Sequence, residues 1–285
     1  MDLLNTNDAV SRRIKAMTER FVSLKEHDLY FYNQAIEEVL SDSKVRVQGR
    51  VMGMYASYSY LGLVGHPRIN EAAKRAVDKF GTGTHGVRTL AGTLTLHDEL
   101  EETIANFKHA EAAMTFSSGY ATNLTVISTL MGRGDYIFSD KLNHASIVDG
   151  CLMSGAEFRR FRHNDMPHLE GLLKNAPVDV AKLVIADSVF SMDGDIIDLP
   201  KMLELCRKYN AWLMIDEAHS VGVLGQKGTG IEEYFGLGDV IDIKMGTLSK
   251  TIPSVGGYVA AKKDIITYLR HASRAYIFSA ALPPA

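Results

Sequence analysis

AWLMIDEAH, residues 211–219, decides the fold, because it joins a short apolar run to a group of polar side chains. The run from Ala211 to Ile215 is unbroken and free of proline, which is typical of a strand buried on both faces of a sheet. Asp216 and His219 follow it directly. In open α/β sheets, ligands bind at the carboxyl ends of the strands. We therefore expect this acid and this histidine to lie in a ligand site.

A second segment rich in apolar residues, Val240–Met245, leads into the sequence GTLSK, which ends at Lys250. It predicts another strand that ends at the same edge. A lone lysine is usually solvated, but one that follows a buried strand is partly desolvated. Desolvation lowers the pKa of the amine, and a neutral amine can form a Schiff base. Thr247 and Ser249 offer hydroxyl groups that suit either a bound phosphate or a cap of the turn.

Strands and helices alternate along most of the chain. We expect strands at 112–116, 136–139, 157–161, 182–187, around Trp212 and Ile241, and at 257–261. We expect helices at 68–80, 97–107, about 120–131, 145–154, 167–174, 200–209 and 263–274. This alternation predicts an α/β fold with a mostly parallel sheet covered on both faces by helices.

The sequence predicts two parts. Residues 1–50 are expected to form an arm with an amphipathic helix at Ser11–Lys25 that packs on a larger body, either the rest of the chain or a partner subunit. Residues 51–285 are expected to form one large domain, which begins with a short strand and a turn between Met52 and Leu63.

Composition excludes several classes of protein. The formal net charge of −3 offers no basic surface to nucleic acid or to an anionic membrane. The two cysteines, Cys151 and Cys206, cannot form a disulfide framework and fit a reducing compartment. No apolar run approaches the roughly 20 residues that cross a bilayer, and the start of the chain does not resemble a signal peptide. We expect a cytoplasmic protein of 285 residues.

Two literal motif matches are rejected on context. Gly81–Gly86 matches the dinucleotide fingerprint GxGxxG, but a helix is expected before it where that fingerprint requires a strand. We interpret it as a loop that lines a pocket. Residues 216–219 spell the DEAH motif of a class of helicases, yet the chain has no Gly-Lys-Ser or Gly-Lys-Thr to bind phosphate. No spacing of His, Cys and carboxylates indicates a metal site.

Two further segments follow predicted strands. Residues 118–120 (SGY) begin a helix, where free backbone N–H groups bind anions. His144 follows the strand expected at 136–139. Together with Asp216, His219 and Lys250, these are the parts that pyridoxal 5′-phosphate requires: a lysine for a Schiff base, an acid for the ring nitrogen and a phosphate anchor. The remaining histidines, such as His66, His109, His163 and His271, are assigned to surface or packing roles.

From about Tyr55 to Ala285, the sequence also resembles the α-oxoamine synthases of the fold-type I pyridoxal-phosphate enzymes. These acyltransferases include 8-amino-7-oxononanoate synthase and serine palmitoyltransferase. The motifs that carry the resemblance are YLGL (60–63), LHxxLE (96–101), SGYxxN (118–123), NHAS (143–146), FSMDGD (190–195), DEAHS (216–220) and YIFS (276–279).

The resemblance implies a role for each matching residue. Lys250 would hold the cofactor as a Schiff base and remove the α-proton of the amino acid. His144 would stack on the cofactor ring with Ala218 on the opposite face, and Asp216 would pair with the ring nitrogen. The other implied cofactor contacts are His219 and Ser191 to the phenolic oxygen, Gly119, Tyr120 and Thr247 to the phosphate, and Ser279 and Ala280 from a second subunit.

The implied reaction is a decarboxylative Claisen-type condensation of an amino acid with an acyl thioester, carried on coenzyme A or on a carrier protein, in a homodimer with shared sites. This chain departs from the family at Ser59, where relatives have Asn, and at Val87, where many have Ser. Relatives also continue into a small C-terminal domain that is missing after Ala285, so impaired condensation is expected. A fold-type I aminotransferase or lyase, or a non-catalytic partner subunit, are the alternatives, although such partners tend to lack the lysine.

Overall fold

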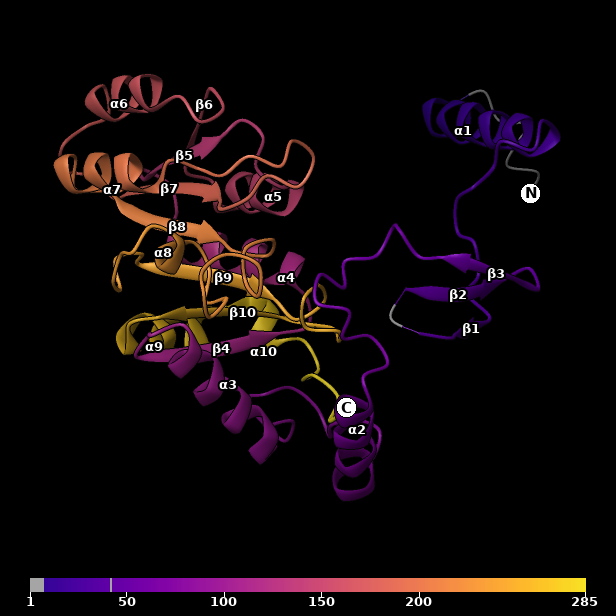
Figure 1. Ribbon diagram of the computed structural model, residues 1–285. Helices are drawn as coiled ribbons and strands as arrows, with labels where there is room; N and C mark the ends of the chain where they lie inside the picture. Colours follow the sequence, from indigo (N-terminus) through magenta and orange to yellow (C-terminus); the bar gives the residue numbers. More distant parts are fainter. Residues whose placement is uncertain (1–7, 42) are drawn as a thin grey trace. The chain divides into compact units, whose positions relative to one another are not determined.

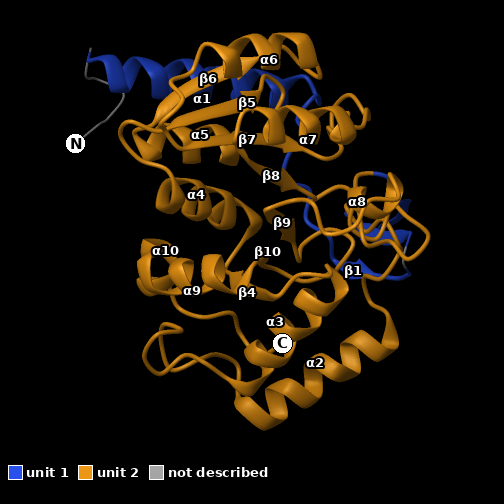
Figure 2. Cartoon of the chain, turned by 90° about the vertical axis from the view of Figure 1, so that its left-hand side faces the viewer, with its two compact units in different colours: residues 1–55 blue, residues 56–285 orange. Residues whose placement is uncertain are grey.

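The computed structural model describes residues 8–41 and 43–285. The chain separates into two compact units, Met1–Tyr55 and Ala56–Ala285 (Figures 1 and 2). In the first unit, helix α1 (Ala9–Glu26) begins at Asp8, whose side chain accepts hydrogen bonds from the N–H groups of Val10 and Ser11. This confirms the helix predicted at Ser11–Lys25.

The first unit also holds a small antiparallel sheet that the sequence did not predict. Its strands are β1 (Glu38–Val39), β2 (Lys44–Val47) and β3 (Arg50–Gly53), in that order. Gln48 and Gly49, both with positive φ, form the tight turn between β2 and β3. These strands are too short for an alternating pattern to stand out. The strand expected between Met52 and Leu63 therefore lies too late in the sequence, because β3 already ends at Gly53.

The second unit is built on a seven-stranded sheet with the order β4-β10-β9-β8-β7-β5-β6. The strands are β4 (Ala112–Phe116), β5 (Tyr136–Asp140), β6 (Glu157–Phe161), β7 (Lys182–Asp187), β8 (Trp212–Asp216), β9 (Ile243–Thr247) and β10 (Gly257–Ala261). The central pairs are parallel, whereas β10 runs antiparallel to β4 and to β9. The predicted mostly parallel sheet is confirmed.

Helices cover both faces of this sheet (Figure 2). The helices of this unit are α2 (Pro67–Phe80), α3 (Thr95–Phe107), α4 (Gly119–Leu130), α5 (Ala145–Ser154), α6 (Met166–Lys174), α7 (Leu199–Lys208), α8 (Ile231–Tyr234), α9 (Lys263–Ala272) and α10 (Arg274–Ile277). Of these, α2 has no buried residue. Side chains of α4, α5 and α9 pack in one apolar cluster on the sheet, and those of α6 and α7 pack in a second. Within the described residues, no helix is both long and apolar enough to span a membrane.

Strand β7 explains why the central strands read as continuous apolar runs. Leu183 and Ile185 belong to the cluster with α4 and α5, whereas Val184 and Ala186 belong to the cluster with α6 and α7. Successive side chains point to opposite faces, and both faces are buried. An apolar residue is therefore needed at each of the four central positions of the strand, from Leu183 to Ala186.

Strand β9 begins later than its predicted start near Val240. The strand starts at Ile243, and the carboxylate of Asp242, just before it, accepts a hydrogen bond from the N–H of Leu213 at 2.8 Å. Lys244 is fully buried inside the strand, where its Nζ lies 2.9 Å from Glu232 and 2.6 Å from Asp239. A charged residue with buried ionic partners thus occupies a strand position, and such a position cannot be predicted from a run of apolar residues.

Candidate active site

The site lies at the carboxyl edge of the sheet, where β8 and β9 deliver His219 and Lys250 to each other. Lys250 Nζ lies 2.7 Å from His219 Nε2, and His219 Nδ1 lies 2.7 Å from the hydroxyl of Tyr60. The ring centroid of Tyr58 is 5.7 Å from Lys250 Nζ. The predicted base and the predicted histidine therefore share one hydrogen-bonded chain.

Burial controls the charge of this pair. It lowers the pKa of the Lys250 amine, and the carboxylates of Asp216 and Asp187 only oppose the effect. Burial, assisted by the charge of Lys250, lowers the pKa of His219 to about 4. His219 is therefore neutral at neutral pH, and the neutral, nucleophilic form of Lys250 is more accessible than for a surface lysine.

Asp216 ends β8 and is 5% exposed. Its Oδ2 accepts a hydrogen bond from Asn123 Nδ2 at 2.7 Å, and its Oδ1 accepts one from the N–H of Ala218 at 2.9 Å. A carboxylate offers about four acceptor positions, so these two bonds leave room for another donor. The arrangement suits a carboxylate that is fixed in place and available to a cationic nitrogen.

A second acid, Asp187, stands beside Asp216. The two residues are partners across strands β7 and β8. Burial, and then the charge of Asp216, raises the pKa of Asp187 well above its usual range. Asp187 also positions the next loop, because its Oδ2 accepts a hydrogen bond from the N–H of His144 at 2.9 Å and its own N–H donates to Asn143 Oδ1 at 3.0 Å.

His144 caps the start of α5 and is an exposed residue at this edge. Its Nδ1 lies 2.7 Å from Ser146 Oγ, and its ring stands edge-on to Tyr120 at a centroid distance of 6.3 Å. The flat face of the ring is thus available to another planar group.

The start of α4 has the features of an anion site. Ser118 Oγ accepts a hydrogen bond from the N–H of Ala121, but no described residue takes up the N–H groups of Gly119 and Tyr120. A Cβ on Gly119 would lie 3.1 Å from Thr247 Oγ1, so a larger residue here would press against the end of β9. The open donors and the nearby hydroxyl match the chemistry of a phosphate group.

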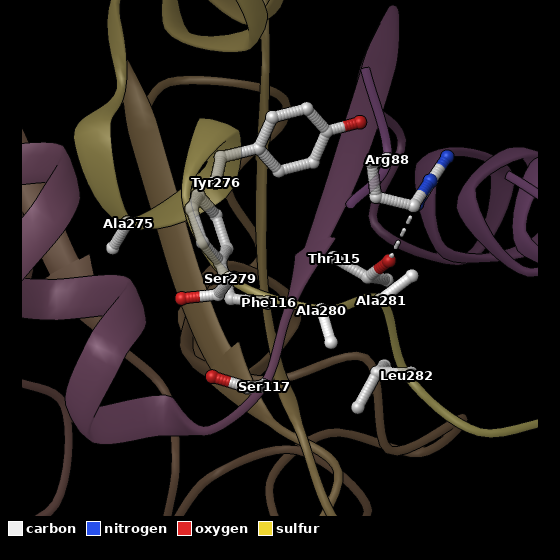
Figure 3. Close-up of a pocket in the computed structure, with 10 residues that line it drawn as sticks. All are labelled: Arg88, Thr115, Phe116, Ser117, Ala275, Tyr276, Ser279, Ala280, Ala281 and Leu282. Atoms are coloured by element: carbon white, nitrogen blue, oxygen red, sulfur yellow. Dashed lines mark hydrogen bonds between the residues drawn. The ribbon is translucent and has the colours of Figure 1, made fainter. Parts of the chain in front are cut away.

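The remaining predicted residues lie around this centre. Ala218 is half-buried, directly after Glu217. Ser191 lies in an exposed turn after β7, and within the described part of the chain it makes no hydrogen bond to another predicted site residue. Ser279 and Ala280 line a small pocket with Ser117 (Figure 3). In that pocket the hydroxyls of Ser117 and Ser279 point to the same side, while the guanidinium of Arg88 turns to the hydroxyl of Thr115.

The loop at Gly81–Gly86 follows helix α2, as the sequence predicted, and not a strand. The carbonyl of Gly86 accepts a hydrogen bond from the N–H of Ala281, and Val87 forms a β-bridge with Ala280. The loop therefore supports the segment that carries Ser279. It does not begin a dinucleotide site.

Sequence reasoning missed three residues of this centre: Asn123, Asp187 and Tyr60 as the partner of His219. Asp187 could have been found, because it ends a predicted strand and so belongs to the carboxyl edge. Asn123 and Tyr60 stand in motifs, but nothing local shows that they reach Asp216 and His219, which are far away in the sequence.

Comparison with known proteins agrees with this geometry. A sequence profile of the aminotransferase class I and II family matches residues 54–285. A serine palmitoyltransferase of Sphingobacterium spiritivorum is 46% identical over 262 residues, which are 92% of this chain and 65% of the relative. An 8-amino-7-oxononanoate synthase of Thermoanaerobacter pseudethanolicus is 44% identical over 274 residues, which are 91% of this chain and 69% of the relative.

Among solved structures, a serine palmitoyltransferase from S. paucimobilis with a bound PLP–myriocin aldimine superposes with a TM-score of 0.94 at 38% identity. The match covers 98% of this chain and 72% of that structure. The fold is that of the fold-type I transferases, as the resemblance implied. The chain spans about two thirds of the length of the curated relatives it matches, namely 65% and 69% of the two named above.

Proposed function

The chain belongs to the class I and II aminotransferase family, and within it to the α-oxoamine synthases, and we propose that it is a pyridoxal-phosphate-dependent acyltransferase. Its substrates would be an amino acid and an acyl thioester, and its product an α-amino ketone with release of carbon dioxide. The observation that carries the proposal is the desolvated amine of Lys250, 2.7 Å from His219 at the strand edge that also holds Asp216.

When bound, pyridoxal phosphate would supply an electron sink for the negative charge that develops at the α-carbon of the amino acid. The residues of this chain fit that group. Asp216 is buried, held by Asn123 and able to accept a further hydrogen bond, as a partner of a protonated ring nitrogen must be. Lys250 would attach the cofactor and then take the α-proton.

The other cofactor contacts are assigned by position. Gly119, Tyr120 and Thr247 would hold the phosphate, since the open N–H groups of α4 face this part of the edge. His144 would stack on the ring with Ala218 on the other face. His219, and Ser191 from its turn, would hydrogen-bond the phenolic oxygen, which a neutral His219 can do from a nitrogen released by Lys250.

We also propose a homodimer in which Ser279 and Ala280 reach the phosphate of the partner's site. A cytoplasmic location is consistent with the two cysteines, Cys151 and Cys206, which are free and buried. Burial raises the pKa of each thiol to about 12. Buried thiols of this kind are inert and need no oxidising compartment.

Spectroscopy with the cofactor tests the proposal directly. Purified protein mixed with pyridoxal phosphate should gain a visible absorption band, and borohydride should fix the cofactor to a peptide that contains Lys250. Lys250→Ala should lose both signals. Lys262→Ala is the matched control, because Lys262 is exposed and remote from the edge. Labelling at another lysine, or no band with the folded protein, would refute the assignment.

Product analysis tests the reaction. Carbon dioxide release should require an amino acid together with an acyl thioester, assayed over a panel of amino acids with both coenzyme A and carrier-protein thioesters. An α-amino ketone supports the proposal. A keto acid formed without a thioester would instead indicate an aminotransferase.

A further inference from the structure

His163 connects two acids from different parts of the chain. Its Nδ1 lies 2.9 Å from Asp140 Oδ1, and its Nε2 lies 2.5 Å from Asp195 Oδ2. Nothing in the local sequence distinguishes His163 from the other histidines assigned to surface or packing roles. Yet Asp140 ends β5, directly before the loop to His144, and Asp195 belongs to the segment that carries Ser191.

The geometry favours the protonated form of this imidazole. A neutral ring has one N–H donor and one bare nitrogen, and a bare nitrogen cannot donate to a carboxylate. Here both ring nitrogens face carboxylate oxygens, so both hydrogen bonds form only with the imidazolium. Asp140 is fully buried, and its two oxygens accept hydrogen bonds from the N–H groups of Leu142 and Asn164, each at 2.8 Å.

The segment held by Asp195 is a hairpin, residues 188–197. Val189 and Ile196 form a β-bridge, and the N–H of Phe190 donates to the carbonyl of Asp195 at 3.0 Å. The turn at its tip, from Ser191 to Gly194, is exposed. Few contacts of its own therefore fix the position of Ser191, and the base of the hairpin must do so.

Two neighbouring residues fasten that base. The His163 ring packs nearly perpendicular to the ring of the buried Phe190, at a centroid distance of 4.4 Å. The next residue, Asn164, donates from Nδ2 to the carbonyl of Ile196 at 3.2 Å and accepts from the N–H of Asp198 at 3.0 Å. Of these contacts, only the two ion pairs of His163 depend on a charge.

Through Asp140, His163 is also connected to the loop that precedes His144. Asp140 Oδ1 accepts the hydrogen bond from Leu142 while it contacts His163. One imidazolium thus joins the loop before His144 to the hairpin of Ser191, two segments that the proposed function places on the cofactor.

We propose that protonated His163 is a positioning residue, a charged clamp that holds the Ser191 hairpin against the His144 loop and thereby keeps both in register with the cofactor. The clamp can be tested without cofactor. Its link to cofactor retention rests on the proposed function.

The clamp should open on the alkaline side. Burial disfavours the charge on His163, but the hydrogen bonds to Asp140 and Asp195 outweigh it, so its pKa is raised. Because the pKa of His163 is higher in the folded protein than its usual value near 6.5, protonation stabilises the fold. This contribution to the free energy of unfolding is complete below pH 6.5 and is lost as the pH rises through the folded-state pKa. The titratable groups that face the ring are Asp140 and Asp195. Arg162, on its own segment, is paired with Asp165 at 2.7 Å.

Amide hydrogen exchange of the cofactor-free protein is the first experiment. His163→Gln and Asp195→Asn should each lower the protection factors of residues 189–196 by about tenfold at neutral pH, as the loss of one charge-assisted hydrogen bond implies. In the wild type, protection should fall as pH rises from 6 to 9, and this step should vanish in both variants. His271→Gln is the matched control, since its ring contacts only its own helix at Thr267 among the described residues.

Unchanged protection in both variants, or a pH step that survives in His163→Gln, overturns the clamp. Asp195→Asn covers the possibility that His163→Gln does not fold, because the Asp195 side chain is 40% exposed and the change is isosteric.

The second measurement is the rate at which bound pyridoxal phosphate is lost on dilution. Both variants should lose the cofactor several times faster than the wild type, and the difference should shrink above the pH step. Faster exchange with an unchanged rate of cofactor loss would overturn the positioning role. If the wild type never binds the cofactor, the proposed function fails, while the exchange data still decide whether the clamp exists.

Discussion

Lys250 owes its expected reactivity to two opposing influences that act within a few ångströms. Burial favours the neutral amine, while Asp216 and Asp187 favour the ammonium form. Burial prevails, so the amine should react with acylating reagents at lower pH than an exposed lysine.

Competitive labelling of the cofactor-free protein checks this prediction. The pH at half-maximal reactivity should be lower for Lys250 than for the exposed Lys262, as measured by mass spectrometry of the labelled peptides. Asp216→Asn should lower it further, because that change removes one of the charges that stabilise the ammonium form. Equal midpoints for the two lysines would contradict the assignment.

Asp187 should make the protein less stable at neutral pH than at acid pH. Burial and Asp216 raise its pKa in the folded state, so the folded protein binds this proton more tightly than the unfolded chain does. Stability is therefore lost as pH rises from the usual aspartate value of about 3.9 through the raised one.

Asp187→Asn removes that loss and keeps an oxygen to accept the N–H of His144. Thermal unfolding of the cofactor-free protein should show a gain in Tm that is larger at pH 8 than at pH 5. Asp179→Asn, at an exposed position before β7, is the control and should show no such trend. A gain of the same size at both pH values would contradict the raised pKa.

Residues of the site differ in how far the sequence could reveal them. Asp216, His219 and Lys250 follow predicted strands, so the carboxyl-edge rule places them together before any coordinates exist. His163 carries no such signal. Its partners, Asp140 and Asp195, come 23 and 32 residues away, and only the pairing of β5 with β6 and the fold of the hairpin bring them to it.

At the level of elements, Gly257 fixes the approach of β10 to α4. A Cβ at this position would lie 2.7 Å from the N and Cα atoms of Gly119, which are backbone atoms that cannot turn away. Gly257→Ala should therefore lower the free energy of unfolding by about 1–3 kcal/mol and weaken binding of pyridoxal phosphate, because it displaces the phosphate site.

Gly171→Ala is the matched control for this change. Gly171 lies inside α6, and its added Cβ would meet nothing within 4 Å. Here the substitution should stabilise the protein by about 0.5–1 kcal/mol, because alanine favours the helix. Urea unfolding and cofactor titration of both variants test the pair of predictions, and an equal effect of the two substitutions would contradict them.

Elements with a clear apolar period were predicted to the residue. Strands β4, β6, β7 and β10 and helix α5 have the bounds expected from the sequence. The predicted strand bounds were wrong, or strands were missed, where polar residues interrupt the apolar pattern. Buried ion pairs of Lys244 hide the true extent of β9, and the short strands β1–β3 depend on the turn at Gln48 and Gly49 more than on any apolar face.

On the scale of the whole molecule, the proposed sharing of sites between two subunits makes a mixing prediction. Lys250→Ala removes the Schiff base of its own site, and Ser279→Asp would place a negative charge beside the partner's phosphate. Neither homodimer should show the visible band with pyridoxal phosphate. Refolding the two variants together should restore it in mixed dimers, which retain one intact site.

The control is a second mixture, in which the single variant Lys250→Ala is refolded with a double variant that carries both Lys250→Ala and Ser279→Asp. That mixture has no intact site in any dimer, so the band should stay absent. Sedimentation of each sample verifies that dimers are present. A band in Ser279→Asp alone would show that Ser279 does not approach a phosphate at all.

The antiparallel strand β10 has one consequence for how the molecule is made. It lies between β4 and β9 in the sheet. Strand β4, the first strand of this sheet in the sequence, therefore pairs with no other strand until β10, the last one, has been synthesised. During synthesis, the segment that opens α4 leaves the ribosome long before Gly257 does. A nascent polypeptide that has emerged as far as Lys250 already contains this lysine and Asp216, but it lacks β10, the strand that packs against the start of α4. The nascent chain should therefore become able to bind pyridoxal phosphate only near the end of its synthesis.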